Sequence, residues 1–338
     1  MTLPLRAFVT GIGLFVAGGA SAAEPPLPAE LVPAYQAGVA SVDGYRWMRG
    51  LFPDASEQER ALTDVARQFQ SQCAAAATEA EMAKLQAIAP DATLPRGRYA
   101  QSPQCRYFAS SAFPVDATWS DFSAALGRVL ATLQRNELLG AAPRLTKPSM
   151  AEEVQERAQR DQRLRSALIV AINGAGDFTA FTPLERQVAR AMLSRIVWDS
   201  DEANADFIET HVLSSGWPDR RNGGGEAARA AWLLVQHADS RPSLQLRALR
   251  MMEPMLTSGG ASGRDYAMLY DRVMLKLSGR QRYGTQWTCS GTTRTMLPHE
   301  GSVRDVEARR GPMGLEPLER NREIMDTAYG PCRAAQRP

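Results

Sequence analysis

The chain lacks a strong excess of charge of either sign, and it lacks long apolar runs beyond its first residues. Acidic and basic residues are well mixed over the 338 residues, and the formal net charge is +2. Such a balance gives no electrostatic basis for binding nucleic acid or an anionic membrane surface. After the first 22 residues, no segment is long and apolar enough to cross a bilayer. We therefore expect neither a nucleic-acid partner nor a membrane span.

Several patterns of catalytic and metal sites are also missing. The sequence has no C-x-x-C pair and no G-x-S-x-G motif, which argues against a zinc cluster and a nucleophile elbow. A metal site made of His211, His237 and a carboxylate such as Asp239 lacks the H-E-x-x-H spacing that puts two ligands on one helix face. We expect no metal and no other cofactor.

The first residues have the pattern of an export signal. Arg6 supplies a positive start, a short apolar stretch follows, and Ala20, Ser21 and Ala22 are the small residues that a signal peptidase needs. No cysteine follows the apolar stretch, which argues against a lipid-anchored form. We expect cleavage near Ala22 and a periplasmic or secreted location.

The four cysteines fit an oxidising compartment. They are Cys73, Cys105, Cys289 and Cys332. Four cysteines allow three pairings, and the sequential pairing keeps each bridge local. Each bridge would then add roughly 3–4 kcal/mol to stability in the chain-entropy model.

Alternation of apolar and polar residues is nearly absent, whereas signals for helix starts are frequent. Ser56, Ser149 and Thr182 each stand three residues before a glutamate, which is the pattern of a capping box, and Pro183 suits a first helical position. We predict a mostly α fold, a bundle of antiparallel helices, with at most short strands near 106–113 and 286–297.

A glycine and two prolines interrupt the helical pattern between Leu139 and Ser149. We place a boundary there. The expected parts are a signal peptide at 1–22, an N-terminal helical module at 23–147 and a C-terminal helical domain at 148–338.

Polar residues stand at the inward edges of four expected helices, which start near positions 149, 201, 226 and 264. They are Asp161 and Arg165 on the first, Asn204 on the second, Gln236 and His237 at the end of the third, and Asp271 on the fourth. A buried polar group without a partner costs on the order of 1–3 kcal/mol. We therefore expect these side chains to meet, either as a structural network or as a site.

A structural role accounts for each of these residues taken singly. His237 suits the dipole at a helix C-terminus, and Asp239 could cap the helix that begins around Arg241. Asp161 and Arg165 are four residues apart and can pair within their own helix.

From about Pro148 to Glu323 the chain resembles a family of bacterial proteins defined only as a domain of unknown function. The resemblance is carried, in order, by RDQRLR (160–165), DEAN (201–204), GWP (216–218), AAWLLVQHAD (230–239), YAMLYDRV (266–273), QRYGTQ (281–286) and DVEARRGPMGLEPL (305–318). It implies motif positions but no reaction. These positions include the inward polar residues and add Trp217, Gln281, Tyr283 and Gln286.

Our first functional hypothesis is a binding or interaction module of the cell envelope, with a small polar ligand or another envelope protein as its partner. The ligand contacts would come from Asp161, Arg165, Asn204, Trp217, Gln236, Gln281, Tyr283 and Gln286. The alternative is a hydrolase-type enzyme with His237 as general acid or base, oriented by Asp239 or Asp271. A purely structural polar network is the third reading. The sequence carries no indication of the oligomeric state.

Overall fold

The computed structural model describes residues 23–95, 97–109, 113–139, 149–222 and 224–332. The expected signal peptide at 1–22 and nearly all of the expected boundary at 139–149 lie outside these ranges. Within them the chain is mostly helical, as predicted, with one short two-stranded hairpin. None of the helices in this described part has the length and apolar character needed to cross a membrane.

The described ranges contain twelve α-helices and two strands. The helices are α1 (Val32–Ala37), α2 (Glu57–Ile88), α3 (Pro103–Tyr107), α4 (Trp119–Arg135), α5 (Met150–Ile172), α6 (Pro183–Phe207), α7 (Leu213–Ser215), α8 (Gly225–His237), α9 (Pro242–Met252), α10 (Gly263–Ser278), α11 (Val303–Arg310) and α12 (Leu318–Tyr329). The strands are β1 (Trp287–Ser290) and β2 (Thr293–Met296).

The three predicted capping boxes are confirmed. Ser56, Ser149 and Thr182 accept the amide proton of the glutamate three residues on, and each glutamate side chain accepts from the backbone of its capping residue. Ser302 makes the same arrangement with Asp305 at the start of α11. These bonds satisfy amide groups that have no partner inside the helix, and each cap typically contributes about 1 kcal/mol.

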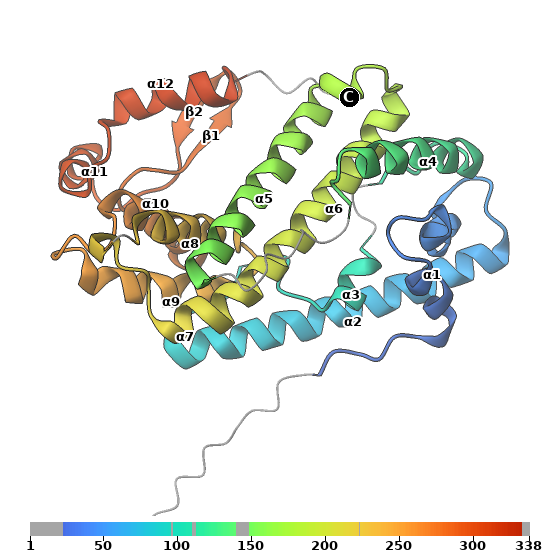
Figure 1. Ribbon diagram of the computed structural model, residues 1–338, viewed down its shortest axis with the longest axis horizontal. Helices are drawn as coiled ribbons and strands as arrows, with labels where there is room; N and C mark the ends of the chain where they lie inside the picture. Colours follow the sequence, from blue (N-terminus) through green and yellow to red (C-terminus); the bar gives the residue numbers. More distant parts are fainter. Residues whose placement is uncertain (1–22, 96, 110–112, 140–148, 223, 333–338) are drawn as a thin grey trace, which may run out of the picture.

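The helices α5 and α6 lie side by side (Figure 1), and two hydrophobic cores lie along them. The first gathers α1, α2, α3 and α4 around Ala171 of α5 and the segment of α6 near Met192. The second gathers α7 to α10 around Val154 of α5 and the last residues of α6. The long helix α2 also packs against α9, so elements far apart in the sequence share an interface.

One of the two stretches that could hold a short strand does not form one, and one predicted helix start is wrong. The described residues of 106–113 form no strand, because Ser102 caps a short helix, α3, in which Pro103 occupies the first position. No helix begins at Asp201 either. That residue lies inside α6, which has no internal proline or glycine to stop it before the π-helical turn Ile208–Val212.

The strands expected within 286–297 are present and form an antiparallel hairpin in which Trp287 faces Met296 and Cys289 faces Arg294. Gly291 turns the chain with a φ of 61°, a left-handed conformation that favours glycine. A disulfide from Cys289 to Cys332 ties this hairpin to the segment that follows α12.

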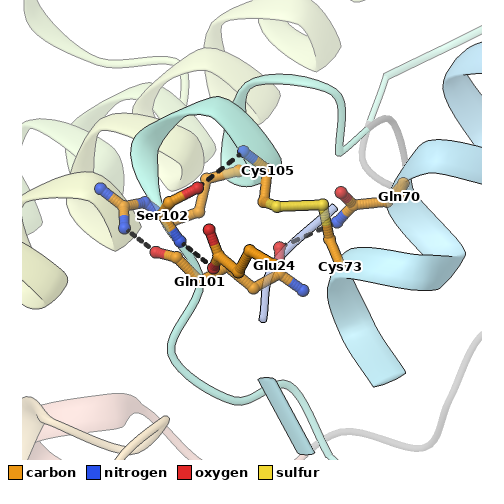
Figure 2. Close-up of a disulfide and its surroundings, with 7 residues drawn as sticks. Glu24, Gln70, Cys73, Gln101, Ser102 and Cys105 are labelled. Carbon is orange, nitrogen blue, oxygen red and sulfur yellow. Dashed lines mark hydrogen bonds between the residues drawn. A yellow bond between two sulfur atoms is a disulfide. The ribbon is translucent and has the colours of Figure 1, made fainter. Parts of the chain in front are cut away.

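The second disulfide joins Cys73 to Cys105, so both bridges follow the sequential pairing. Figure 2 shows this bridge between α2 and α3, with the Gln70 amide donating to Gln101 at 3.1 Å beside it. Both sulfurs belong to buried residues of the first core. Two disulfides of this kind suit an oxidising environment outside the cytoplasm.

Candidate functional site

A cleft of about 420 Å³ lies between residues that precede α3 and residues of α6, α8, the turn between α8 and α9, α9 and α10. The former are Pro95, Gly97, Arg98 and Tyr99. The latter are Trp198, Asp201, His237, Asp239, Ser240, Pro242 and Lys276. Its volume falls within the range of sites that hold small molecules.

His237, the last residue of α8, joins the cleft to a buried cluster of charged groups. Its Nδ1 lies 2.9 Å from Oδ2 of Asp161, at an angle that does not make a regular hydrogen bond. Oδ1 of Asp161 accepts from Nε of Arg165 at 3.0 Å, and Nη2 of Arg165 reaches Oδ1 of Asp201 at 2.5 Å. We call Asp161, Arg165, Asp201 and His237 the acid–histidine cluster.

The two carboxyl groups of the cluster have different environments. The Asp161 side chain is 1 % exposed, whereas those of Asp201 and His237 are 16 % and 18 % exposed and reach the cleft. Burial raises the pKa of Asp201 to about 7, and the neighbouring Asp161 carboxylate adds to this shift against the pull of Arg165. Burial also opposes ionisation of Asp161, but contact with His237 and the charge of Arg165 hold its pKa below the usual range.

This arrangement can exchange protons near neutral pH. The Asp161 carboxylate lies against the Nδ1 side of the imidazole, so Nε2 is the ring nitrogen that is not in contact with it. Asp201 supplies a second group that changes its protonation close to pH 7. Neighbouring groups with pKa values pushed apart in this way are found in acid–base sites, and also in structural ion-pair networks.

A metal ion would find three ligand atoms of two types here, because one atom each from Asp161, Asp201 and His237 lies within 4.8 Å of the others. The Arg165 guanidinium, however, bonds to both carboxyl groups and already supplies a positive charge to them. We therefore describe the cluster as an ion-pair network that contains a histidine. His211, part of the metal site considered from the sequence, stacks on Phe207 instead, with its Nδ1 3.3 Å from that residue's carbonyl oxygen.

Asp239 lines the cleft, and its backbone amide donates to the His237 carbonyl at 2.8 Å, but its carboxylate makes no described bond to the imidazole. Its carboxylate accepts from Nε of Arg272 at 2.8 Å and from Nζ of Lys276 at 2.6 Å. These two cations lower its pKa to about 2, although burial works in the opposite direction. Asp239 also leaves the start of α9 uncapped. Glu81 of α2 takes that role by accepting from the amide of Ser243 at 2.7 Å.

Asp271 belongs to a separate, closed network. Its carboxylate accepts three backbone amides, from Arg282, Tyr283 and Thr285, at 2.7 to 2.9 Å. Burial nevertheless raises its pKa, and its side chain is fully covered. Asp271 therefore fixes the turn after α10 and does not reach the cleft lining.

Gln281 completes this network. Its Nε2 donates to the carbonyl groups of Gln286 and Leu297 at 2.9 and 2.8 Å, and its Oε1 accepts from the amide of Gln286 at 2.8 Å. The buried Arg310 donates to the Tyr283 carbonyl at 2.6 Å. The QRYGTQ stretch is thus held mainly through its backbone.

The remaining predicted ligand contacts lie away from the acid–histidine cluster. Asn204 faces Arg157, whose Nη1 is 3.4 Å from its Oδ1. Trp217 is buried in the second core. Gln236 is 7 % exposed and its Oε1 has no hydrogen-bond partner in the described part of the chain.

Helical spacing therefore predicted that Asp161, Arg165 and His237 would lie close together. It did not predict Asp201 or most of the residues that line the cleft. Asp201 falls within the DEAN motif, and its spacing of three residues from Trp198 on α6 is a local signal that was available. Lys276 and the segment 97–99 carry no such signal, because they reach the cleft from distant parts of the chain.

Residues 188–332 match the model of a family of unknown function, DUF6624. The match covers less than half of the chain, includes Asp201 and His237, and begins after Asp161 and Arg165. No curated protein and no solved structure matches the chain.

Proposed function

We propose that the protein binds a small polar ligand in the cleft at His237. The observation that carries this proposal is the contrast between two polar networks. The network of Asp271 and Gln281 is closed on itself, whereas the acid–histidine cluster presents His237 and Asp201 to a cleft of about 420 Å³. Polar groups that converge on a cleft of this size are typical of ligand sites.

We further propose that the protein works outside the cytoplasm, in the periplasm or after secretion. The signal-like pattern of residues 1–22 supports this location, as do the two disulfides. Another envelope protein remains a second kind of partner in this proposal.

A thermal-shift screen tests the ligand proposal. The mature protein, residues 23–338, is screened against sugars, amino acids, nucleotides, metal ions and cell-wall fragments. His237→Ala is compared with His211→Ala, which also removes an imidazole but at an exposed position outside the cleft. We expect a compound that raises the melting temperature of wild type and His211→Ala but not of His237→Ala. A shift that survives in His237→Ala, or the lack of any shift, contradicts the proposal.

A hydrolase-type activity is the second candidate, and the contact between Asp161 and His237 favours it. A buried carboxylate that orients an imidazole, with the second ring nitrogen left for proton transfer, is the arrangement used to activate water or a hydroxyl group. Asp201 would supply a second proton-exchanging group at the same cleft.

Chromogenic esters, phosphate monoesters and glycosides test this second candidate. Turnover by the wild type that is lost in His237→Ala and has an altered pH profile in Asp201→Asn supports it. Turnover that is equal in all three proteins assigns the activity to a contaminant or to another site.

A further inference from the structure

We propose, on the basis of the ligand-binding function above, that the ligand of the cleft is a small organic anion that is held through a carboxylate or phosphate group. Three features of the surroundings carry this inference: the cationic side chains of the lining, the pairing of Asp239 with two cations, and the partial protonation of Asp201 near neutral pH.

Arg98 and Lys276 bring two cationic side chains to the lining from distant parts of the sequence. The Arg98 guanidinium lies 5.5 Å from the centre of the Trp198 ring, a cation–π contact that holds it at the wall of the cleft. A guanidinium presents its N–H groups in one plane and bonds to carboxylate or phosphate oxygens in pairs. Arg98 is therefore the group of the lining best suited to an anion.

The carboxylate of Asp239 does not cancel the charge of these cations. It is bonded by both Arg272 and Lys276, so this set of three side chains carries one positive charge in excess. Burial lowers the pKa of Lys276, but Asp239 opposes that shift, and its Oδ1 lies 2.6 Å from Nζ, which favours the ammonium form. The set thus adds a positive charge to that of Arg98.

The acid–histidine cluster offers little repulsion to an anion. Asp161 and Asp201 share the guanidinium of Arg165, which would leave one negative charge if both were ionised. The pKa of Asp201 is about 7, however, so near neutral pH this carboxyl group is protonated in roughly half of the molecules. A negative charge that enters the cleft raises this pKa further, so binding itself favours the neutral form.

The carboxyl groups behind the lining are compensated as well. Three acids pair with three bases in one network, which consists of Glu202, Asp206, Glu209, Arg241, Arg247 and Lys84. Glu81 caps α9, and burial raises its pKa, so it ionises less readily than an exposed glutamate. Positive charge is therefore in excess around the cleft, and such a cleft attracts anions.

Calorimetry with matched pairs of compounds tests the inference: lactate and lactamide, glucuronate and glucose, and glycerol 3-phosphate and glycerol. Glucosamine, a cation, is the control of opposite sign. We expect at least one anion to bind about tenfold more tightly than its neutral partner, or better, and glucosamine to bind no more tightly than glucose. Binding confined to the carboxylates or to the phosphate identifies the anionic group. The inference is overturned if no anion is preferred to its neutral partner, or if glucosamine binds more tightly than glucuronate.

Matched variants test the role of Arg98 with the anion that binds most tightly. Arg98→Gln removes the charge, Arg98→Lys keeps it, and Arg190→Gln removes a charge from an exposed position of α6 outside the cleft. We expect Arg98→Gln to weaken binding about tenfold, Arg98→Lys to lose less, and Arg190→Gln to stay close to wild type. Wild-type affinity in Arg98→Gln, or equal losses in Arg98→Gln and Arg98→Lys, contradicts the role given to the charge.

The outcomes also separate this inference from the proposed function. If no anion is preferred, but another compound gives a shift that His237→Ala abolishes, the anion inference fails and the ligand cleft stands. If no compound of the screen binds, both fail.

Discussion

Asp201 is the residue through which pH acts on the cluster most directly. Its pKa in the folded protein is about 7, raised by burial and by Asp161, whereas an exposed aspartate titrates near 3.9. The folded state therefore binds this proton more tightly than the unfolded state does. The stability that the protonated group contributes is fully present below roughly pH 4 and is lost as the pH rises to about 7.

We predict that Asp201→Asn removes this dependence. Relative to the variant, the wild type should lose up to roughly 4 kcal/mol of unfolding free energy between pH 4 and pH 7.5. Urea unfolding of both proteins over this range measures the difference, and Asp161 is present in both. If the unfolding free energies of wild type and Asp201→Asn differ by the same amount at every pH in this range, Asp201 titrates normally.

Residue spacing predicted part of this cluster, because that part depends on positions within single helices. Asp161 and Arg165 are four residues apart on one helix, and His237 ends a helix that is apolar on most sides. The carboxylates of Asp239 and Asp271, which we expected to orient His237, bind groups 33 residues and 11 to 14 residues further along the chain. Helical periodicity does not contain such contacts.

At the scale of secondary-structure elements, Glu81 fixes α2 to the start of α9. Its buried carboxyl group accepts the Ser243 amide, and burial raises its pKa. We predict that Glu81→Ala lowers stability by about 1–3 kcal/mol, because it leaves a buried amide without a partner. Glu81→Gln retains a carbonyl acceptor and should lose much less.

Chemical unfolding at neutral pH compares these variants with Glu79→Ala, which removes an exposed glutamate from the same helix. Equal losses in Glu81→Ala and Glu79→Ala would mean that the bond to Ser243 does not hold the two elements together.

The bridge between α2 and α3 supports one wall of the cleft, because the segment 97–99 runs directly into α3. We predict that replacing Cys73 and Cys105 together with alanine costs roughly 3–4 kcal/mol, for a closed loop of 32 residues. It should also weaken ligand binding.

Replacing Cys289 and Cys332 provides the matched control. It opens a loop of 43 residues and removes a similar stabilisation, but it leaves the 97–99 segment attached. Differential scanning calorimetry and the ligand-induced thermal shift measure the two effects. Equal loss of the shift in both double variants would remove the specific role of the Cys73–Cys105 bridge.

Helix starts were predictable from the sequence, whereas two local structures were not. Each capping box consists of residues three positions apart, so the signal is complete within a short window. Residues 106–113 offered apolar and aromatic side chains that suit a strand. The cap at Ser102, the proline at position 103 and the bridge at Cys105 instead favour a short helix.

At the scale of the whole molecule, the cleft depends on the way the two cores meet. Residues that line it come from the segment before α3 and from α6, α8, α9 and α10, and α2 and α9 pack together. The family match covers residues 188–332 alone, so the segment 97–99, Asp161 and Arg165 are contributed by the part of the chain before it. The expected division into two modules stays a prediction, and the cleft would need both of them.

The most direct test of ligand binding at this cleft uses the small number of histidines. His211, His237 and His299 are the three in the sequence, and their imidazole signals can be followed separately by nitrogen-detected NMR. The spectrum is recorded while adding the compound with the largest thermal shift. We predict that the signals of His237 move in a saturable manner and that those of His211 and His299 stay in place. Unchanged His237 signals at saturating compound, or movement confined to the other two histidines, would contradict a ligand site at His237.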